Sequence, residues 1–96
     1  MKKTIAVLGS TGSIGRQTLD VVSAFPGYFK VAALATKGYL DILEKQTGRF
    51  RPPLVSIADR DFDRNKFFPS RVLSGPDSLI KIAQDPSIDI LVIVVS

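Results

Sequence analysis

The sequence predicts an α/β fold built on a doubly wound parallel sheet. Short apolar runs alternate with segments in which apolar residues recur at helical spacing, which is the pattern of strands linked by helices. A glycine-rich stretch follows the first apolar run, where a parallel strand is expected to turn into a helix. The length of 96 residues leaves room for a single domain, 1–96, or for part of a larger protein.

The first half of the chain is predicted to form two strand–helix pairs. Residues 4–8 are an apolar run that ends at a glycine, which is typical of a strand buried on both faces. The helix that follows is expected to begin near Ser13 and to end before Pro26. Its apolar positions are Ile14, Leu19, Val22 and Phe25. The second pair is a strand at 29–35 and a helix at 40–46.

The middle of the chain has weaker patterning. Residues 54–58 are expected to form a third strand after Pro52 and Pro53, which stop the preceding helix. Residues 59–66 alternate acidic and basic side chains, which favours a solvated loop or a short helix. Residues 71–73 are expected to form a minor edge strand.

The last predicted elements are a helix and a strand. The helix has Pro76 in its first turn and stops by Asp85. Its apolar positions are Leu79, Ile80 and Ala83. Residues 88–95 are expected to form a strand as buried as the first. Because ligands of open α/β sheets bind beyond the carboxyl ends of the strands, we expect the sheet to be truncated after this fourth main strand.

Composition excludes several kinds of chemistry. The chain has no cysteine and no histidine, which excludes disulfides, thiol nucleophiles, the usual zinc sites and triads with an imidazole base. Its net charge of +4 is spread without a long block of like charges, which favours a local anion site over nucleic acid. The apolar run near the start is too short for a secretory signal or a membrane span, so a cytoplasmic location without a membrane partner is expected.

The sequence GSTGSIG, between the first strand and the first helix, is the motif that carries chemistry. Gly9 permits the sharp turn, Gly12 lets the backbone approach a pyrophosphate, and Gly15 allows close packing of the helix. The N–H groups and the dipole at the helix start favour phosphate, and Thr11 and Ser13 add hydroxyl donors. The spacing differs from the common GxGxxG, so a glycine-rich connection without a ligand remains open, but the context favours a Rossmann-like dinucleotide site.

The end of the second strand favours NADPH over NADH. A domain that binds NAD usually places a carboxylate there for the ribose 2′-hydroxyl, whereas this chain has Lys37. An ammonium group would attract a 2′-phosphate; alternatively, Lys37 is an exposed loop lysine beside Gly38. Tyr39 either lies against the adenine or covers the start of the next helix, and the sequence does not decide between them.

Three stretches of the chain together resemble one enzyme family. They are GSTGSIG with QTLDVV at 17–22, FKVAALA at 29–35 and VLSG at 72–75, and they resemble the start of 1-deoxy-D-xylulose 5-phosphate reductoisomerases. The resemblance covers essentially the whole chain. It implies an enzyme of non-mevalonate isoprenoid biosynthesis that forms 2-C-methyl-D-erythritol 4-phosphate by rearrangement to an aldehyde and hydride delivery. It also implies NADPH, a divalent cation (Mg or Mn), a sugar phosphate substrate and a homodimer at full length.

The resemblance assigns cofactor-binding residues but no catalytic or metal-binding ones. The family's first NADPH segment falls on Thr11, Gly12, Ser13 and Ile14. Its second segment, usually Gly, then Ser, Lys or Arg, then Asn, falls on Lys37, Gly38 and Tyr39. Here the basic residue comes one place early and tyrosine replaces asparagine. The metal-binding carboxylates, substrate-phosphate site and lid are expected beyond Ser96, so residues 1–96 alone are expected to be inactive.

Two other functions are kept as alternatives. One is another NADP-dependent Rossmann oxidoreductase, similar to aspartate-semialdehyde dehydrogenase, which would have a cysteine nucleophile after residue 96. The other is a non-catalytic nucleotide-binding module, suggested by the basic pI near 9.7, whose binding would fall steeply with salt.

Overall fold

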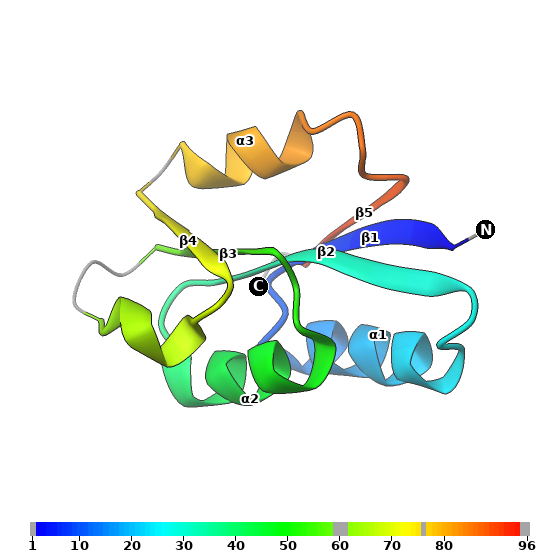
Figure 1. Ribbon diagram of the computed structural model, residues 1–96, viewed down its shortest axis with the longest axis horizontal. Helices are drawn as coiled ribbons and strands as arrows, with labels where there is room; N and C mark the ends of the chain where they lie inside the picture. The colour runs from blue at the N-terminus through cyan, green and yellow to red at the C-terminus, as the bar shows by residue number, and fades with distance from the viewer. Residues whose placement is uncertain (1, 59–61, 76, 95–96) are drawn as a thin grey trace.

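The computed structural model describes residues 2–58, 62–75 and 77–94. Strands and helices alternate along these residues (Figure 1). The elements are β1 (Lys3–Leu8), α1 (Ser13–Ala24), β2 (Phe29–Thr36), α2 (Leu40–Phe50), β3 (Leu54–Ile57), the 3-10 helix η1 (Arg64–Phe67), β4 (Arg71–Ser74), α3 (Ser78–Ala83) and β5 (Ile90–Ile93).

The five strands form one parallel sheet in the order β4-β3-β2-β1-β5. From β1 the chain moves outward through β2 and β3 to β4, and α3 then returns it to the other side of β1. Helices α1 and α2 lie on one face of the sheet and α3 lies on the other (Figure 1). The predicted doubly wound α/β fold is confirmed, and the winding direction reverses between β1 and β5, where such sheets bind ligands.

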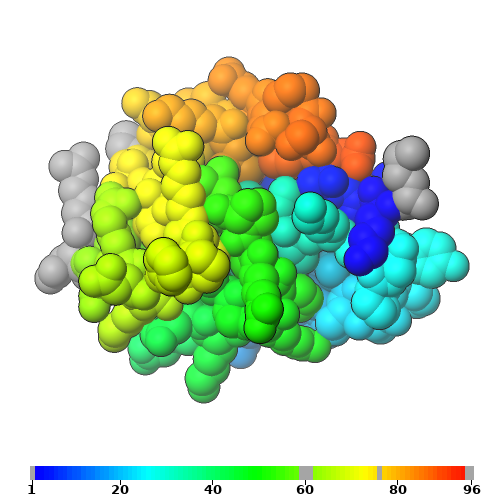
Figure 2. All heavy atoms as spheres, viewed as in Figure 1, coloured from blue at the N-terminus to red at the C-terminus, as the bar shows by residue number. Residues whose placement is uncertain are grey.

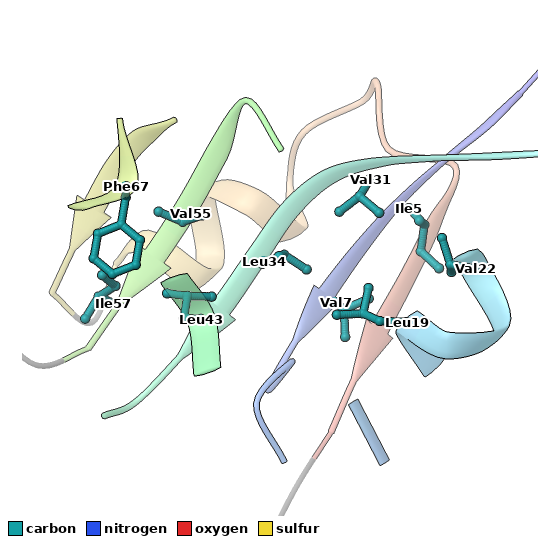
Figure 3. Close-up of a cluster of buried hydrophobic side chains, with 10 residues drawn as sticks. All are labelled: Ile5, Val7, Leu19, Val22, Val31, Leu34, Leu43, Val55, Ile57 and Phe67. Atoms are coloured by element: carbon teal, nitrogen blue, oxygen red, sulfur yellow. The ribbon is translucent and has the colours of Figure 1, made fainter. Parts of the chain in front are cut away.

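The core on the α1 and α2 face is made of branched aliphatic side chains and one phenylalanine (Figure 3). Its fully or nearly fully buried members are Ile5, Val7, Leu19, Val22, Val31, Leu34, Leu43, Val55, Ile57 and Phe67. The other face carries small residues on β1 and β2, Ala6, Ala33 and Ala35, against which Ile82 of α3 packs. The small alanine side chains leave room for the short helix to approach the sheet. In the space-filling view the atoms of α3 form the upper surface of the molecule (Figure 2).

The predicted faces of two helices are partly wrong. In α1, Ile14 and Phe25 are 59% and 50% exposed, because Gly15, Leu19 and Val22 form the stripe that faces the sheet. In α3, only Ser78 and Ile82 are buried. The apolar positions that were expected to face the sheet, Leu79, Ile80 and Ala83, are exposed.

The last strand also differs from its prediction. It spans Ile90–Ile93 rather than 88–95, and the end of the predicted range lies outside the described residues. It is an edge strand of the described sheet, with Leu91 36% and Ile93 60% exposed. The physical reason is the position of α3, whose Ile82 packs against alanines of β1 and β2 and leaves this face of β5 uncovered.

The end of one helix differs from expectation. Helix α2 continues past residue 46 to Phe50 and ends where Arg51 adopts a left-handed φ of 48°, directly before Pro52. Of the two alternatives expected for residues 59–66, the short helix is confirmed by η1, which extends one residue further to Phe67, a residue buried in the core. Pro76, expected in the first turn of the last helix, lies outside the described residues.

Candidate nucleotide-binding site

The strands end together at one edge of the sheet, next to the glycine-rich loop. In the strand register, Leu8 of β1 lies beside Ala35 of β2 and Ile93 of β5, and Thr36 lies beside Ile57 of β3. A hollow of about 190 Å³ opens at this edge, between the strand ends and α3. Its lining includes Gly9, Thr36, Lys37, Ser56 and Ser78.

Gly9 makes the turn out of β1. Its φ is +93°, a conformation that side-chain-bearing residues rarely adopt, and its N–H donates to Ala35 O at 2.9 Å. A Cβ at this position would lie 3.0 Å from both Cβ and O of Val94. The predicted sharp turn is therefore confirmed, and the loop runs close against the residue that follows β5.

Gly15 and Gly12 have opposite surroundings. A Cβ on Gly15 would lie 2.2 Å from the carbonyl oxygen of Gly9 and 2.7 Å from Cα of Ser10, so the first turn of α1 packs directly on the loop backbone. A Cβ on Gly12 would meet only Gly9 O, at 3.7 Å, and Gly12 is exposed. The loop is therefore closed on its Gly15 side and open on its Gly12 side.

The start of α1 presents unpaired donors at this open side. Gly12 is the N-terminal cap and provides no side-chain hydrogen bond, and the first turn contains no acidic residue. Within the described residues, the N–H groups of Ser13, Ile14 and Gly15 have no hydrogen-bond partner. Such N–H groups, together with the positive end of the helix dipole, favour the binding of an anion such as phosphate.

The structure brings the two predicted cofactor segments together. Thr11 in the loop is buried, and its Oγ1 lies 2.6 Å from Oγ1 of Thr36, the last residue of β2. The second segment follows Thr36 directly, with Lys37 exposed at the rim of the hollow. Within the described part of the chain, Lys37 makes no ion pair. An anion at the loop therefore has an ammonium group near the adjacent strand end.

The hydroxyl of Thr11 differs from the role expected for it, whereas Tyr39 lies at the start of α2, in agreement with one of the two positions considered for it. The hydroxyl of Thr11 faces Thr36, so it is the buried anchor of the loop rather than an exposed donor beside Ser13. Tyr39 caps α2 with its backbone, makes no side-chain hydrogen bond there and is 68% exposed. Gly38, between Lys37 and Tyr39, is also exposed.

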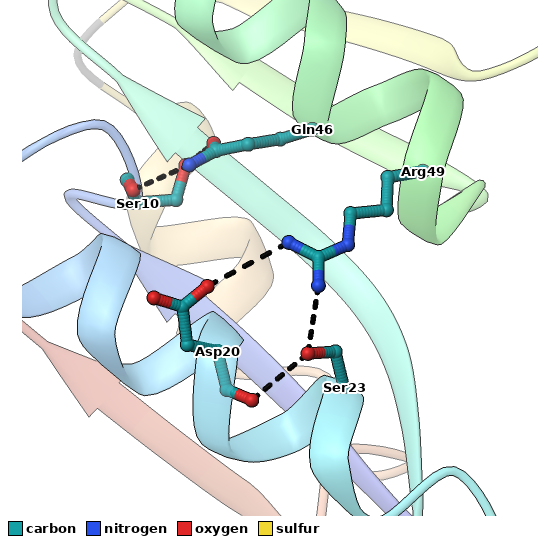
Figure 4. A network of polar contacts seen from close by, with 5 residues as sticks. All are labelled: Ser10, Asp20, Ser23, Gln46 and Arg49. Carbon is teal, nitrogen blue, oxygen red and sulfur yellow. Dashed lines mark hydrogen bonds and ion pairs between the residues drawn. The ribbon is translucent and has the colours of Figure 1, made fainter.

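Sequence reasoning missed a buried polar pair behind the loop. Ser10 Oγ donates to Gln46 Oε1 at 2.9 Å, and Gln46 Nε2 donates to Ser10 O at 2.8 Å (Figure 4). The signal for this pair was Gln46 itself, a polar residue at helical spacing between the apolar Leu43 and Phe50.

A second link between α1 and α2 lies at the surface. Arg49 reaches Asp20 at 3.6 Å and donates to Ser23 Oγ at 2.8 Å (Figure 4). The Arg49 and Asp20 side chains are 55% and 72% exposed. An exposed pair of this kind contributes about 0 to 1 kcal/mol, so the link is not what holds the loop.

Away from the glycine loop, the described residues show few features of a metal or catalytic site. They contain no group of three or more acidic, histidine or cysteine side chains arranged to hold a metal ion. The pKa of Asp85 lies below its ordinary value, because its carboxylate accepts two hydrogen bonds from Ser87. The bond from the backbone N–H has the larger effect and the bond from the hydroxyl the smaller one. Asp85 lies before β5, at the amino edge of the sheet and away from the loop. No helix within the described ranges is both long and apolar enough to cross a membrane.

Fold and site together define the chain as a Rossmann-like α/β domain with a phosphate-binding type of glycine loop between β1 and α1. The family model for 1-deoxy-D-xylulose 5-phosphate reductoisomerase matches residues 5–96. The chain belongs to this family, as its sequence motifs predicted.

Individual relatives agree with the family match. The reductoisomerase of Thermomicrobium roseum is 47% identical over 96 residues, which are 100% of this chain and 25% of the relative. A crystal structure of DOX-P reductoisomerase in complex with NADPH, fosmidomycin and magnesium superimposes with a TM-score of 0.85 at 27% identity, covering 93% of this chain and 23% of that one. The Zymomonas mobilis enzyme in complex with NADPH gives 0.77 at 30% identity, covering 86% and 23%. This chain therefore spans about a quarter of the length of its relatives.

Proposed function

We propose that this chain is the NADPH-binding part of an enzyme that converts 1-deoxy-D-xylulose 5-phosphate to 2-C-methyl-D-erythritol 4-phosphate. The main observation in support of this proposal is the open face of the glycine loop. There Gly12 leaves space, and the N–H groups at the start of α1 have no partner among the described residues. Two solved relatives are described as complexes with NADPH. The family match favours this proposal over a semialdehyde-dehydrogenase-like oxidoreductase and over a non-catalytic nucleotide-binding module.

The residues present fit a dinucleotide phosphate. The pyrophosphate would lie against the loop segment Thr11, Gly12, Ser13 and Ile14, where the N–H groups of Ser13 and Ile14 are free to donate and Gly12 leaves space. The 2′-phosphate would lie near Lys37, with Gly38 and Tyr39 beside it. When bound, NADPH supplies the hydride for the reduction. The protein's part is to hold the phosphates at the carboxyl edge of the sheet, at the point where its winding reverses.

The role of Lys37 can be tested by charge reversal. We expect Lys37→Glu to weaken NADPH binding by about 5- to 30-fold or more and to change NADH binding far less, because only NADPH carries the 2′-phosphate. Isothermal titration of each cofactor measures both affinities. Lys30→Glu, the same charge change at the other end of β2, is the matched control and should not alter the preference. Equal losses for the two cofactors would exclude Lys37 as the 2′-phosphate contact.

The remaining parts of the enzyme are proposed from the family. A divalent cation, Mg or Mn, would polarise the substrate carbonyl, and the described residues contain no cluster that could hold it. We assign residues 1–96 to the cofactor domain and place the catalytic carboxylates, the sugar phosphate site and the homodimer contacts in a longer, cytoplasmic protein.

Residues 1–96 alone are expected to show no catalysis. With 1-deoxy-D-xylulose 5-phosphate, NADPH and magnesium or manganese, we expect no substrate-dependent loss of absorbance from NADPH. We also expect self-association, since Leu91 and Ile93 on the edge strand are exposed. Circular dichroism confirms folding in the same sample, and light scattering measures its mass. Turnover in the folded sample would place catalytic residues inside this chain and contradict the proposal.

A further inference from the structure

Gln46 is a buried polar residue on a helix face that otherwise packs into the core. It is 8% exposed, and the same face of α2 carries Leu43 and Thr47, which are 0% and 5% exposed. An amide group buried in this way is costly unless its donors and acceptor are paired. Gln46 therefore has a specific partner or destabilises the fold, and the structure shows the partner.

The partner is Ser10, a fully buried residue of the glycine loop 36 positions away. The Gln46 amide both donates to the Ser10 carbonyl and accepts from the Ser10 hydroxyl, at 2.8 and 2.9 Å, so two bonds close a ring (Figure 4). The N–H of Ser10 donates to Ala35 O at 3.0 Å. Ser10 is thereby held from β2 and from α2 at once.

The position of Ser10 determines where α1 begins. Cα and C of Ser10 would lie 2.7 and 2.9 Å from a Cβ on Gly15, so its backbone packs directly on the first turn of α1. A displacement of Ser10 would therefore displace the N–H groups that face the open side of the loop. Gln46 is 8% exposed, and both hydrogen bonds of its amide group go to Ser10 rather than to the N–H groups at the start of α1.

We propose that Gln46 is a positioning residue for NADPH, which acts by holding Ser10 so that the N–H groups at the start of α1 are already arranged for the pyrophosphate. This inference rests on the proposed function. If only a fraction of the molecules has the loop in its binding arrangement, the apparent affinity for the ligand is reduced in proportion to that fraction. The bond pattern also explains the residue type, because only a group that donates and accepts at the same end can close the ring.

Glutamate at position 46 makes the proposal testable through pH. An ionised carboxylate can accept from Ser10 Oγ but cannot donate to Ser10 O, which it would repel. A protonated carboxyl group can do both, as the amide does. Burial and the facing carbonyl raise the pKa of such a carboxyl group above its ordinary value of about 4.3. The defect of Gln46→Glu should therefore be large at high pH and should diminish as the pH falls.

The experiment compares Gln46→Leu, Gln46→Glu and Thr47→Val in the full polypeptide that carries these residues. Thr47 is the matched control, because its buried hydroxyl donates to Leu43 O within α2 and does not reach the loop. We expect Gln46→Leu to weaken NADPH binding by about 5- to 30-fold, relative to wild type at the same pH. We expect Gln46→Glu to do the same at about pH 8 and to recover at least threefold of that loss at about pH 5.5. Thr47→Val should bind NADPH as wild type does.

A second readout needs no cofactor. The N–H of Ser10 donates to Ala35 O and that of Arg16 donates to Gly12 O, so both amides report on the loop by hydrogen exchange. Exchange at both should be faster in Gln46→Leu and unchanged in Thr47→Val. If wild type does not bind NADPH, the proposed function fails. If wild type binds and either Gln46 variant keeps wild-type affinity, or the Gln46→Glu defect does not depend on pH, the positioning role is overturned.

Discussion

Replacing Gly15 with alanine is expected to lower the free energy of unfolding by about 3 kcal/mol or more. The new Cβ would lie 2.2 Å from the carbonyl oxygen of Gly9 and 2.7 Å from Cα of Ser10. Both atoms belong to the backbone, so no flexible side chain can move aside. The turn after β1 or the first turn of α1 must shift, at the place where the two elements pack. Urea unfolding followed by circular dichroism measures the loss.

Gly48→Ala is the control for this substitution. Gly48 is an exposed position inside α2, and a Cβ there meets nothing within 4 Å. Alanine is the better helix former by about 0.5 to 1 kcal/mol, so this variant should be slightly more stable than wild type. A Gly15→Ala protein as stable as wild type would show that α1 does not pack on the loop as the structure has it.

Replacing Gly12 with valine should weaken cofactor binding and leave the fold intact, in contrast to the loss of stability expected for Gly15→Ala. We expect NADPH affinity to fall by about 100-fold or more, while the helical content stays close to that of wild type. Gly12 has φ −74° and ψ 171°, which valine adopts without strain, and a Cβ there meets only one atom, at 3.7 Å. The side chain would instead occupy the open side of the loop, in front of the free N–H groups at the start of α1.

Titration with NADPH and a circular dichroism spectrum of the same sample separate these two effects. Gly27→Val is the control, because Gly27 also has open space around it and lies in the turn between α1 and β2, at the opposite edge of the sheet. It should bind NADPH normally. If Gly12→Val lost its helical content while Gly15→Ala kept it, the roles assigned to these two glycines, facing the phosphate and packing on the loop, would be wrong.

Much of this site could be predicted because its signals are local. The strand, the turn at Gly9 and the start of α1 at Ser13 follow one another within a short stretch of the chain. The alternation of apolar runs with helical patterns was sufficient for a doubly wound parallel sheet. Lys37 at the end of β2 could be identified by its distance in sequence from the glycines, since the length of the intervening helix and strand is nearly constant in such units.

Burial was predicted less well, because it depends on which element covers which face. Residues 90–93 have the same apolar character as β1, yet Ile93 is 60% exposed while Leu8, its register partner on β1, is 6% exposed and packs in the same cluster as Ile82 of α3. The difference arises because α3 packs over β1 and β2 and not over β5. Likewise Phe67, in a segment of mixed charge, is buried, because η1 brings it onto the α2 side of the sheet.

The sequence by itself determined the class of fold, the order of its elements, the family and the loop that faces the proposed cofactor. Each of these depends on residue types at short spacings along the chain. Only the tertiary structure decided how that loop is held. Thr11 meets Thr36 across 25 positions and Ser10 meets Gln46 across 36. Such pairs form because parallel strands end at a common edge and α2 packs against the sheet beneath it, and no local pattern in the chain specifies which polar side chains will then face each other.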